Sequence, residues 1–222
     1  AECALEYNVP KFIFSSNKTV YGDGVVPYRE SSPLLPSTNP YGETKVMSER
    51  ILSDTAKVNP GLSVTLLRYF NPIGAHKSGL LGEIPVGTPN NLMPYITQVA
   101  KGKLEKLRVF GSDYNTIDGT GVRDFIHVVD LAYGHMAALE KMREGINVYN
   151  LGTGKGTSVL ELIHTFETVN EIKIPYDIVD RRPGDIASSY ADVSKAYDEL
   201  GWKTEKSVED MCRDSWFFEK NQ

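Results

Sequence analysis

Short apolar runs alternate along the chain with longer segments of helical periodicity. The apolar runs have the length and composition of buried parallel strands. We expect strands at 11–16, 63–69, 107–111, 148–151 and 175–179. We expect helices from Pro40 to near Asn59 and at 92–102, 129–142, 157–168 and 193–200, with a last amphipathic helix after Ser207. Strands that alternate with helices predict an α/β fold with a mostly parallel sheet.

Polar residues predict where three of these helices begin. Asp192 is expected to cap the helix at 193–200, and Ser207 with Asp210 is expected to cap the last helix. Thr157 is expected to open the helix at 157–168, with Glu161 too far along for a capping box.

The helix that begins at Pro40 carries Tyr41 and Lys45. Proline fits the first turn of a helix, where its missing N–H costs nothing. The two residues are four apart, so their side chains leave the same helix face. An ammonium held beside a phenol favours the phenolate, so this pair can supply a base near neutral pH. A bare YxxxK spacing is more often an ordinary surface helix, and the interpretation therefore depends on the surrounding motifs.

Composition narrows the class of protein. The 222 residues are 41% hydrophobic and 24% charged, as in globular proteins with a substantial core. A net charge of −5 without a basic run argues against nucleic-acid binding, and no apolar stretch is long enough to span a bilayer. The two cysteines and four histidines show no metal-ligand spacing, so we expect no metal site and a cytoplasmic protein.

Six motifs, in family order, resemble the UDP-glucose (galactose) 4-epimerases of the extended short-chain dehydrogenase/reductase superfamily. They are FSSxxxVYG at 14–22, YxxxK at 41–45, RYFNPxGAH at 68–76, NNLMP at 90–94, GxGVRDxIHVxD at 119–130 and RRxGD at 181–185. The resemblance covers the whole chain. It implies the C-terminal part of a Rossmann-type doubly wound parallel sheet plus a smaller α/β substrate-binding domain.

The resemblance also implies how the chain divides. Residues 1–72 would be the second half of the dinucleotide-binding domain. Residues 73–222 would mainly bind the nucleotide sugar, with 122–150 packing back on the first domain. Family members begin with a strand, a Gly-rich turn and a helix that hold the NAD pyrophosphate, and we expect this chain to be the C-terminal two-thirds. The glycines at 152–156 lack the third glycine of GxGxxG and do not replace that turn.

The implied reaction is the NAD-dependent interconversion of UDP-glucose and UDP-galactose through a 4-keto sugar. Tyr41 would be the base that removes the O4 proton, and Lys45 would favour the phenolate and hold the nicotinamide ribose hydroxyls. Asn17 would join them in catalysis and, with Tyr69 and Phe70, would contact the cofactor. The implied substrate-binding residues are Thr19, Asn71, Asn91, Leu92, Arg108, Val109, Phe110, Arg123, Arg182, Asp185 and Ser189.

The substrate residues divide by the part of the molecule they would contact. Arg123 and Arg182 suit bidentate contact with the diphosphate. Asn71, Asn91 and Leu92 would line the diphosphate and sugar. Residues 108–110 would bracket the uracil, largely through backbone atoms. Asp185 would accept a hydrogen bond from a ribose hydroxyl.

Asn17 departs from the family pattern, which places a serine or threonine there to bond O4 and relay its proton. An amide cannot relay a proton as a hydroxyl does. Three alternatives follow: Asn17 positions the sugar while Tyr41 acts directly, Thr19 supplies the hydroxyl, or catalysis is impaired.

Ser189 is the second departure, because the family often has a bulky tyrosine at this position beside the sugar C2 substituent. A small residue leaves room for an acetamido group, so we expect UDP-GlcNAc and UDP-GalNAc as further substrates. The alternative is a loop path that moves Tyr190 into the same space.

Two other functions are alternatives to the epimerase reaction. A related nucleotide-sugar dehydratase or decarboxylase would use the same Tyr and Lys, but Lys18 stands where those enzymes place an acidic residue. A UDP-sugar-binding fragment without activity is the non-enzymatic alternative.

The family also implies a homodimer through the Tyr41 helix. The apolar residues of that helix equally suit an internal core; they are Val46, Met47, Ile51 and Leu52.

Overall fold

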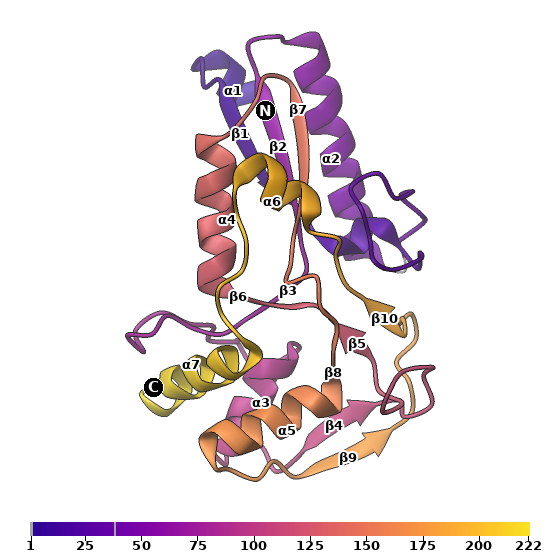
Figure 1. Cartoon of the computed structure of the whole chain (residues 1–222), viewed down its shortest axis with the longest axis vertical. Coiled ribbons are helices and arrows are strands. Elements are labelled where there is room, and N and C mark those ends of the chain that lie inside the picture. The colour runs from indigo at the N-terminus through magenta and orange to yellow at the C-terminus, as the bar shows by residue number, and fades with distance from the viewer. Residues whose placement is uncertain (1, 38) are drawn as a thin grey trace. The chain divides into compact units, whose positions relative to one another are not determined.

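The computed structural model describes residues 2–37 and 39–222; Ala1 and Thr38 lie outside the described residues. The described chain forms two compact units, each built from separate segments (Figure 1). Unit 1 contains the residues up to Phe70, Leu131–Gly154 and Tyr190–Lys203, and unit 2 contains Asn71–Asp130, Lys155–Ser189 and Thr204–Gln222.

Unit 1 is built on a parallel sheet of three strands in the order β1-β2-β7. The strands are β1 (Lys11–Ser15), β2 (Ser63–Tyr69) and β7 (Ile146–Leu151). The helical segments of the unit are α1 (Glu2–Glu6), η1 (Lys18–Tyr21), α2 (Pro40–Val58), α4 (Val128–Glu140, from Leu131 on) and α6 (Ser194–Leu200). Figure 1 shows α2 and α4 on opposite sides of the strands, as in a doubly wound sheet.

Helix α2 packs on β2 through apolar side chains that lie on one face of the helix and on one side of the strand. Leu52 and Ala56 lie one turn apart on the buried face of α2. Val64 and Leu66 alternate along β2, so both point to the same side of the sheet. These four residues and Leu62 form one buried cluster, which leaves the opposite face of α2 exposed.

Unit 2 contains shorter strands in three small groups. Parallel pairs are formed by β3 (Asn71–Ile73) with β6 (Phe125–His127) and by β4 (Leu107–Phe110) with β9 (Tyr176–Val179). The third group has the order β10 (Ser188–Ser189), β5 (Val122–Arg123) and β8 (Thr157–Ser158). The helices are α3 (Leu92–Ala100), α5 (Val159–Asn170) and α7 (Val208–Lys220).

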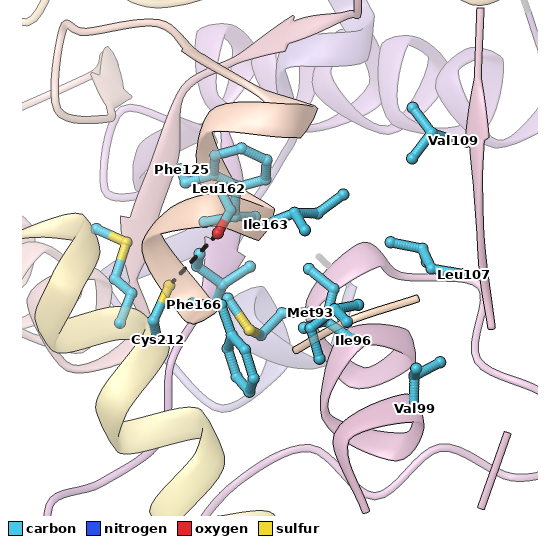
Figure 2. Packing of buried hydrophobic residues seen from close by; sticks show 13 residues of the cluster. Met93, Ile96, Val99, Leu107, Val109, Phe125, Leu162, Ile163, Phe166 and Cys212 are labelled. Carbon is cyan, nitrogen blue, oxygen red and sulfur yellow. Dashed lines mark hydrogen bonds between the residues drawn. The ribbon is translucent and has the colours of Figure 1, made fainter. Parts of the chain in front are cut away.

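One hydrophobic core holds unit 2 together (Figure 2). Met93 and Ile96 come from one face of α3, and Leu107 and Val109 alternate along β4. Cys212 of α7 points toward the carbonyl oxygen of Leu162 in α5, and burial raises the pKa of this thiol to about 12. Its thiol is therefore protonated at neutral pH and serves as a packing residue.

His127 explains the glycine of the RYFNPxGAH motif. The imidazole is fully buried, its Nδ1 accepts the Val129 N–H at 3.0 Å, and its Nε2 lies 3.2 Å from Asp214 Oδ2. Gly74 has a φ of +91°, and a Cβ there would come within 2.9 Å of this ring. Only glycine combines that backbone conformation with the close approach.

The expected helix starts are partly confirmed. Asn39 caps α2 by accepting the Gly42 N–H at 2.8 Å, with Pro40 as the first helical residue. Ser207 and Asp210 form the expected cap of α7 as a full capping box.

Two expected helix starts are wrong. Helix α5 is capped by Ser158 rather than Thr157, and this one-residue shift puts Glu161 at the third position, where it completes a capping box. Helix α6 begins at Ser194 with Val193 as its N-cap. Asp192 stands one residue earlier, where its Oδ1 accepts the Ser194 N–H and hydroxyl.

Across the described residues, no helix is both long and apolar enough to cross a membrane.

Candidate functional site

Tyr41 and Lys45 lie side by side on the first turns of α2 in unit 1. The Lys45 ammonium is 5.5 Å from the centroid of the Tyr41 ring and 5.0 Å from that of Phe14. Its Nζ donates to the carbonyl oxygen of Ser15, the last residue of β1, at 2.9 Å. Tyr41 is 52% exposed, so a ligand can reach the phenol. The pair is therefore an accessible phenol with a fixed cation beside it.

The donors of Lys45 suit a ligand with neighbouring hydroxyls. An ammonium has three N–H donors, and the contact with Ser15 uses one. The other two can serve hydroxyl or carbonyl acceptors, which is the donor set that a nucleotide ribose requires. The residues in this part of unit 1 therefore fit the nicotinamide ribose of NAD.

A buried ion pair lies beneath this pair of residues. Glu49, one turn beyond Lys45 on α2, receives two hydrogen bonds from Arg68 of β2, at 2.9 and 2.6 Å. Ser16 also donates to Glu49, at 2.5 Å. Burial would lower the pKa of Arg68, but the hydrogen bonds and charge of Glu49 outweigh it and raise that pKa above its ordinary value. Glu49 of α2 is thereby linked both to Arg68 of β2 and to Ser16, the residue after the end of β1.

The network continues through Tyr21 of η1. Arg68 Nη1 donates to the Tyr21 hydroxyl at 3.2 Å, and that hydroxyl donates to Asn150 Oδ1 at 2.6 Å. Burial raises the pKa of Tyr21 to about 12 despite the opposing charge of Arg68, so the phenol stays protonated. Its ring stacks on that of Tyr28 at 4.9 Å. The segment that contains Asn17 and Thr19 is therefore fixed at both ends: Ser16 bonds Glu49 before it, and Tyr21 bonds Arg68 and Asn150 after it.

Asn17 and Thr19 have different surroundings. The Asn17 side-chain oxygen caps η1 by accepting the Thr19 N–H at 3.0 Å. The Thr19 hydroxyl oxygen is buried and has no hydrogen-bond partner among the described residues. Thr19 packs against the start of α2, where its Cβ would lie 3.3 Å from a Cβ added to Gly42. The free hydroxyl is thus at Thr19.

Tyr69 and Phe70 end β2 in different environments. Phe70 is 1% exposed and packs with Tyr28, whose ring centroid is 6.4 Å away. Tyr69 is half-buried, and burial together with the Tyr41 phenol raises the pKa of Tyr69. Tyr69 therefore belongs to the surroundings of Tyr41, whereas the Phe70 ring is part of the core of unit 1.

Unit 2 brings Arg123, Asp185 and Ser189 together. Strands β5 and β10 pair so that Arg123 stands opposite Ser189. Arg123 Nη1 donates to the carbonyl of Val122 at 2.9 Å, and its Nη2 lies 3.7 Å from Asp185 Oδ1. Ser189 is fully buried, and its hydroxyl has no partner within the described parts of the chain.

Arg108, Phe110 and Arg182 form a second group in unit 2. The Arg182 guanidinium lies 3.9 Å from the centroid of the Phe110 ring, and that of Arg108 lies 5.7 Å from it. The intervening Val109 is buried and offers only backbone atoms. Arg181 is engaged elsewhere, because it bonds Asp113 at 2.6 Å and stacks on Tyr114. A flat ring with two cations beside it suits a base with an attached phosphate.

Asn71, Asn91 and Leu92 have separate contacts. Asn71 begins β3, and its buried Oδ1 has no partner in the described structure. Asn91 precedes α3 without capping it, and its amide donates to Glu83 Oε1 at 2.8 Å. Leu92 packs against the core of unit 2.

The sequence interpretation missed the Arg68–Glu49 pair and the contact between Ser15 and His135. Glu49 looked like one more polar position on a helix surface. His135 follows Ser15 by 120 residues, and no spacing rule connects residues that far apart.

Comparison with known proteins agrees with the motifs. The model of the NAD dependent epimerase/dehydratase family matches residues 1–152. The UDP-glucose 4-epimerase of Pasteurella multocida is 58% identical over 212 residues, which are 94% of this chain and 63% of that protein.

Solved structures are similar over nearly the whole chain. UDP-glucose 4-epimerase from Bifidobacterium longum, in complex with NAD+ and UDP, has a TM-score of 0.95 and 52% identity, and covers 99% of this chain and 66% of its own. The UDP-Glc/GlcNAc 4-epimerase from Campylobacter jejuni has a TM-score of 0.81 and 38% identity, and covers 100% of this chain and 68% of its own.

The matches confirm the resemblance and the α/β fold with parallel sheets. The chain spans between 63% and 68% of the length of these relatives. The family model covers more than half of the chain, and the motifs that carry the resemblance lie within and beyond the matched range. This chain belongs to the NAD dependent epimerase/dehydratase family.

Proposed function

We propose that this chain carries the base and the nucleotide-sugar residues of an epimerase that interconverts UDP-glucose and UDP-galactose with NAD. The observation that carries the proposal is the exposed Tyr41 phenol beside the Lys45 ammonium, which the Ser15 carbonyl fixes. The relatives named UDP-glucose 4-epimerase support it.

Tyr41 takes the proton from O4 of the sugar, and Lys45 stabilises the phenolate that does so. The two remaining N–H donors of Lys45 hold the nicotinamide ribose hydroxyls. When bound, NAD⁺ would accept the hydride from sugar C4 and, once reduced, would return it to the opposite face of the sugar. Tyr41 gives the proton back to O4.

The residues of unit 2 hold the UDP moiety. Arg123 and Arg182 neutralise the diphosphate, because a guanidinium bonds two phosphate oxygens at once. The Phe110 ring, with Arg182 already against it, provides a flat surface for the uracil. Asp185 accepts a ribose hydroxyl and keeps Arg123 oriented through their ion pair.

A coupled epimerase assay on UDP-galactose with added NAD⁺ tests the function, with calorimetry of UDP binding to the same chain in parallel. Turnover would establish the reaction. UDP binding without turnover would instead favour a UDP-sugar-binding fragment. The absence of both would contradict the proposal for this chain.

We expect Thr19, not Asn17, to supply the relay hydroxyl, because the Asn17 amide oxygen is used as a cap. Thr19→Val should lower kcat by about 10- to 100-fold, part of the contribution that a positioned proton-transfer group makes. In an Asn17→Ser background the same change should cost much less, since a serine hydroxyl then shares the role. Equal losses in the two backgrounds would contradict this assignment, and kcat on UDP-galactose measures both.

We propose that the substrates include UDP-GlcNAc and UDP-GalNAc, because Ser189 is small and its hydroxyl has no partner among the described residues. The relative from Campylobacter jejuni named for both Glc and GlcNAc supports this. Ser189→Tyr should lower kcat/KM for UDP-GlcNAc by about 100-fold and leave UDP-galactose within about threefold, because the ring fills space that only the acetamido group needs. The matched control is Ser188→Tyr on the same strand. If the parent chain turned over only UDP-glucose and UDP-galactose, this proposal would be contradicted.

We propose that the chain forms a homodimer through exposed apolar residues on α2. Met47 and Ile51 are 60% and 62% exposed and lie one turn apart on this helix. Met47→Lys combined with Ile51→Lys should convert a dimer into a monomer of 24.7 kDa in analytical ultracentrifugation. Leu80→Lys with Leu81→Lys, on the exposed surface of unit 2, is the control that should remain dimeric. A monomeric parent chain would contradict the proposal.

A further inference from the structure

Ser15 contacts two helices at the carboxyl end of β1. Its carbonyl oxygen accepts a hydrogen bond from Lys45 of α2, and its Oγ lies 2.9 Å from His135 Nε2 of α4. All three residues belong to unit 1. Neither the Ser15 hydroxyl nor His135 has a role in the chemistry derived above.

The surroundings of His135 fix its tautomer. Its Nδ1 lies 2.9 Å from the carbonyl oxygen of Leu131, one turn earlier in α4. A carbonyl only accepts, so Nδ1 carries the proton, and Nε2 of the neutral ring is then a bare acceptor. The Ser15 hydroxyl therefore donates to Nε2. Held at both nitrogens, His135 presents a fixed acceptor to the end of β1.

The position of Ser15 governs the position of the ammonium. The hydroxyl that bonds His135 and the carbonyl that bonds Lys45 belong to one residue, at the point where β1 ends. On the side of β2, the Tyr69 ring packs 6.3 Å from the His135 ring and limits its movement. Fixing the hydroxyl thus restricts the direction of the carbonyl.

We propose that His135 is a positioning residue, which holds the Ser15 carbonyl in the direction that receives the Lys45 ammonium. Its catalytic consequence rests on the proposed function, because it matters for turnover only if Tyr41 is the base. The chain of contacts itself can be tested without turnover or cofactor.

The test measures how fast each lysine of the folded chain reacts with an acylating reagent, read by mass spectrometry of its peptides. His135→Phe keeps a ring in α4 but removes the acceptor, whereas His135→Gln keeps a side-chain acceptor. We expect the phenylalanine variant to raise the acylation rate of Lys45 by about two- to tenfold, the range for one lost hydrogen bond. The glutamine variant should stay near the parent rate.

Lys195 is a matched internal control in unit 1. Its Nζ donates to the carbonyl of Val148 at 2.9 Å and lies 4.9 Å from the Tyr149 ring centroid, an arrangement like that of Lys45. Its rate should not change in any variant. A parallel rise at Lys195 would reveal general loosening and overturn the proposal, as would an unchanged Lys45 rate or no rescue by glutamine.

Ser15→Ala gives a second measurement if the phenylalanine variant does not fold. It should raise the Lys45 rate by the same factor, and adding His135→Phe to it should raise the rate no further, because both changes remove one hydrogen bond. An additive effect would show that His135 does not act through Ser15.

Turnover separates this inference from the proposed function. In an active chain, His135→Phe should lower kcat more than it changes KM for UDP-galactose, and His135→Gln should recover most of the loss. If Lys45 responds as expected and no variant or parent turns over substrate, the proposed function fails and the positioning role stands.

Discussion

Replacing Arg68 with Met is expected to destabilise unit 1 by about 3–5 kcal/mol, because Glu49 would remain buried without its cation. Both side chains are only 5–6% exposed, and their two hydrogen bonds are 2.6 and 2.9 Å long. The measurement is the free energy of unfolding from urea denaturation, followed by circular dichroism. A loss of this size is a large part of the stability of an ordinary domain.

Arg143→Met is the matched control, since its ion pair with Glu199 is largely exposed on the arginine side. We expect that change to cost under about 1 kcal/mol. Replacing both members of the buried pair, as Arg68→Met with Glu49→Leu, should recover part of the loss because no uncompensated charge remains. If Arg68→Met cost no more than Arg143→Met, the buried network would not be a source of stability.

Tyr41→Phe is expected to lower kcat for UDP-galactose by about 10²- to 10⁴-fold, because it removes the group that we propose exchanges the O4 proton. The ring remains, so its contact with the Lys45 ammonium and the packing of α2 should persist. UDP binding, measured by calorimetry, should be unchanged, since the UDP moiety is assigned to residues of unit 2. The loss should therefore be confined to the chemical step.

The control is Tyr197→Phe, an exposed tyrosine on α6 in the same unit. It should leave kcat unchanged. A Tyr41→Phe variant that retained more than about a tenth of the parent kcat would remove Tyr41 from the role of base.

Long elements could be predicted because their signals are local. Asn39 and Pro40 determine where α2 begins, and the continuous apolar run of β2 gave a strand with the observed bounds of Ser63–Tyr69. The two-residue strands could not be found in this way. Arg123 and Ser189 pair across unit 2, and neither segment has a periodicity of its own. Such strands exist only because a distant partner supplies their hydrogen bonds.

The same distinction between local and long-range signals applies to the candidate site. Tyr41 and Lys45 could be paired from sequence because a single helix sets their separation. The grouping of Phe110 with Arg182, and of Ser15 with His135, depends on how remote strands and helices pack. Asn17 shows a further limit: its departure from the family pattern was visible, but its use as a helix cap required the backbone conformation.

The segmented construction of unit 1 has a consequence for synthesis on the ribosome. Strand β2 can pair with β1 soon after both emerge, but its other edge waits for β7, since Val64 pairs with Ile146. At typical translation rates, the roughly 80 residues in between take about 4–16 s to appear. During that interval an apolar strand has one open edge, the kind of surface that chaperones cover and that neighbouring nascent chains can pair with. The sheet of unit 1 is therefore expected to be completed only after β7 has emerged, and its folding is expected to be slow for its size because so many of its contacts are distant in sequence.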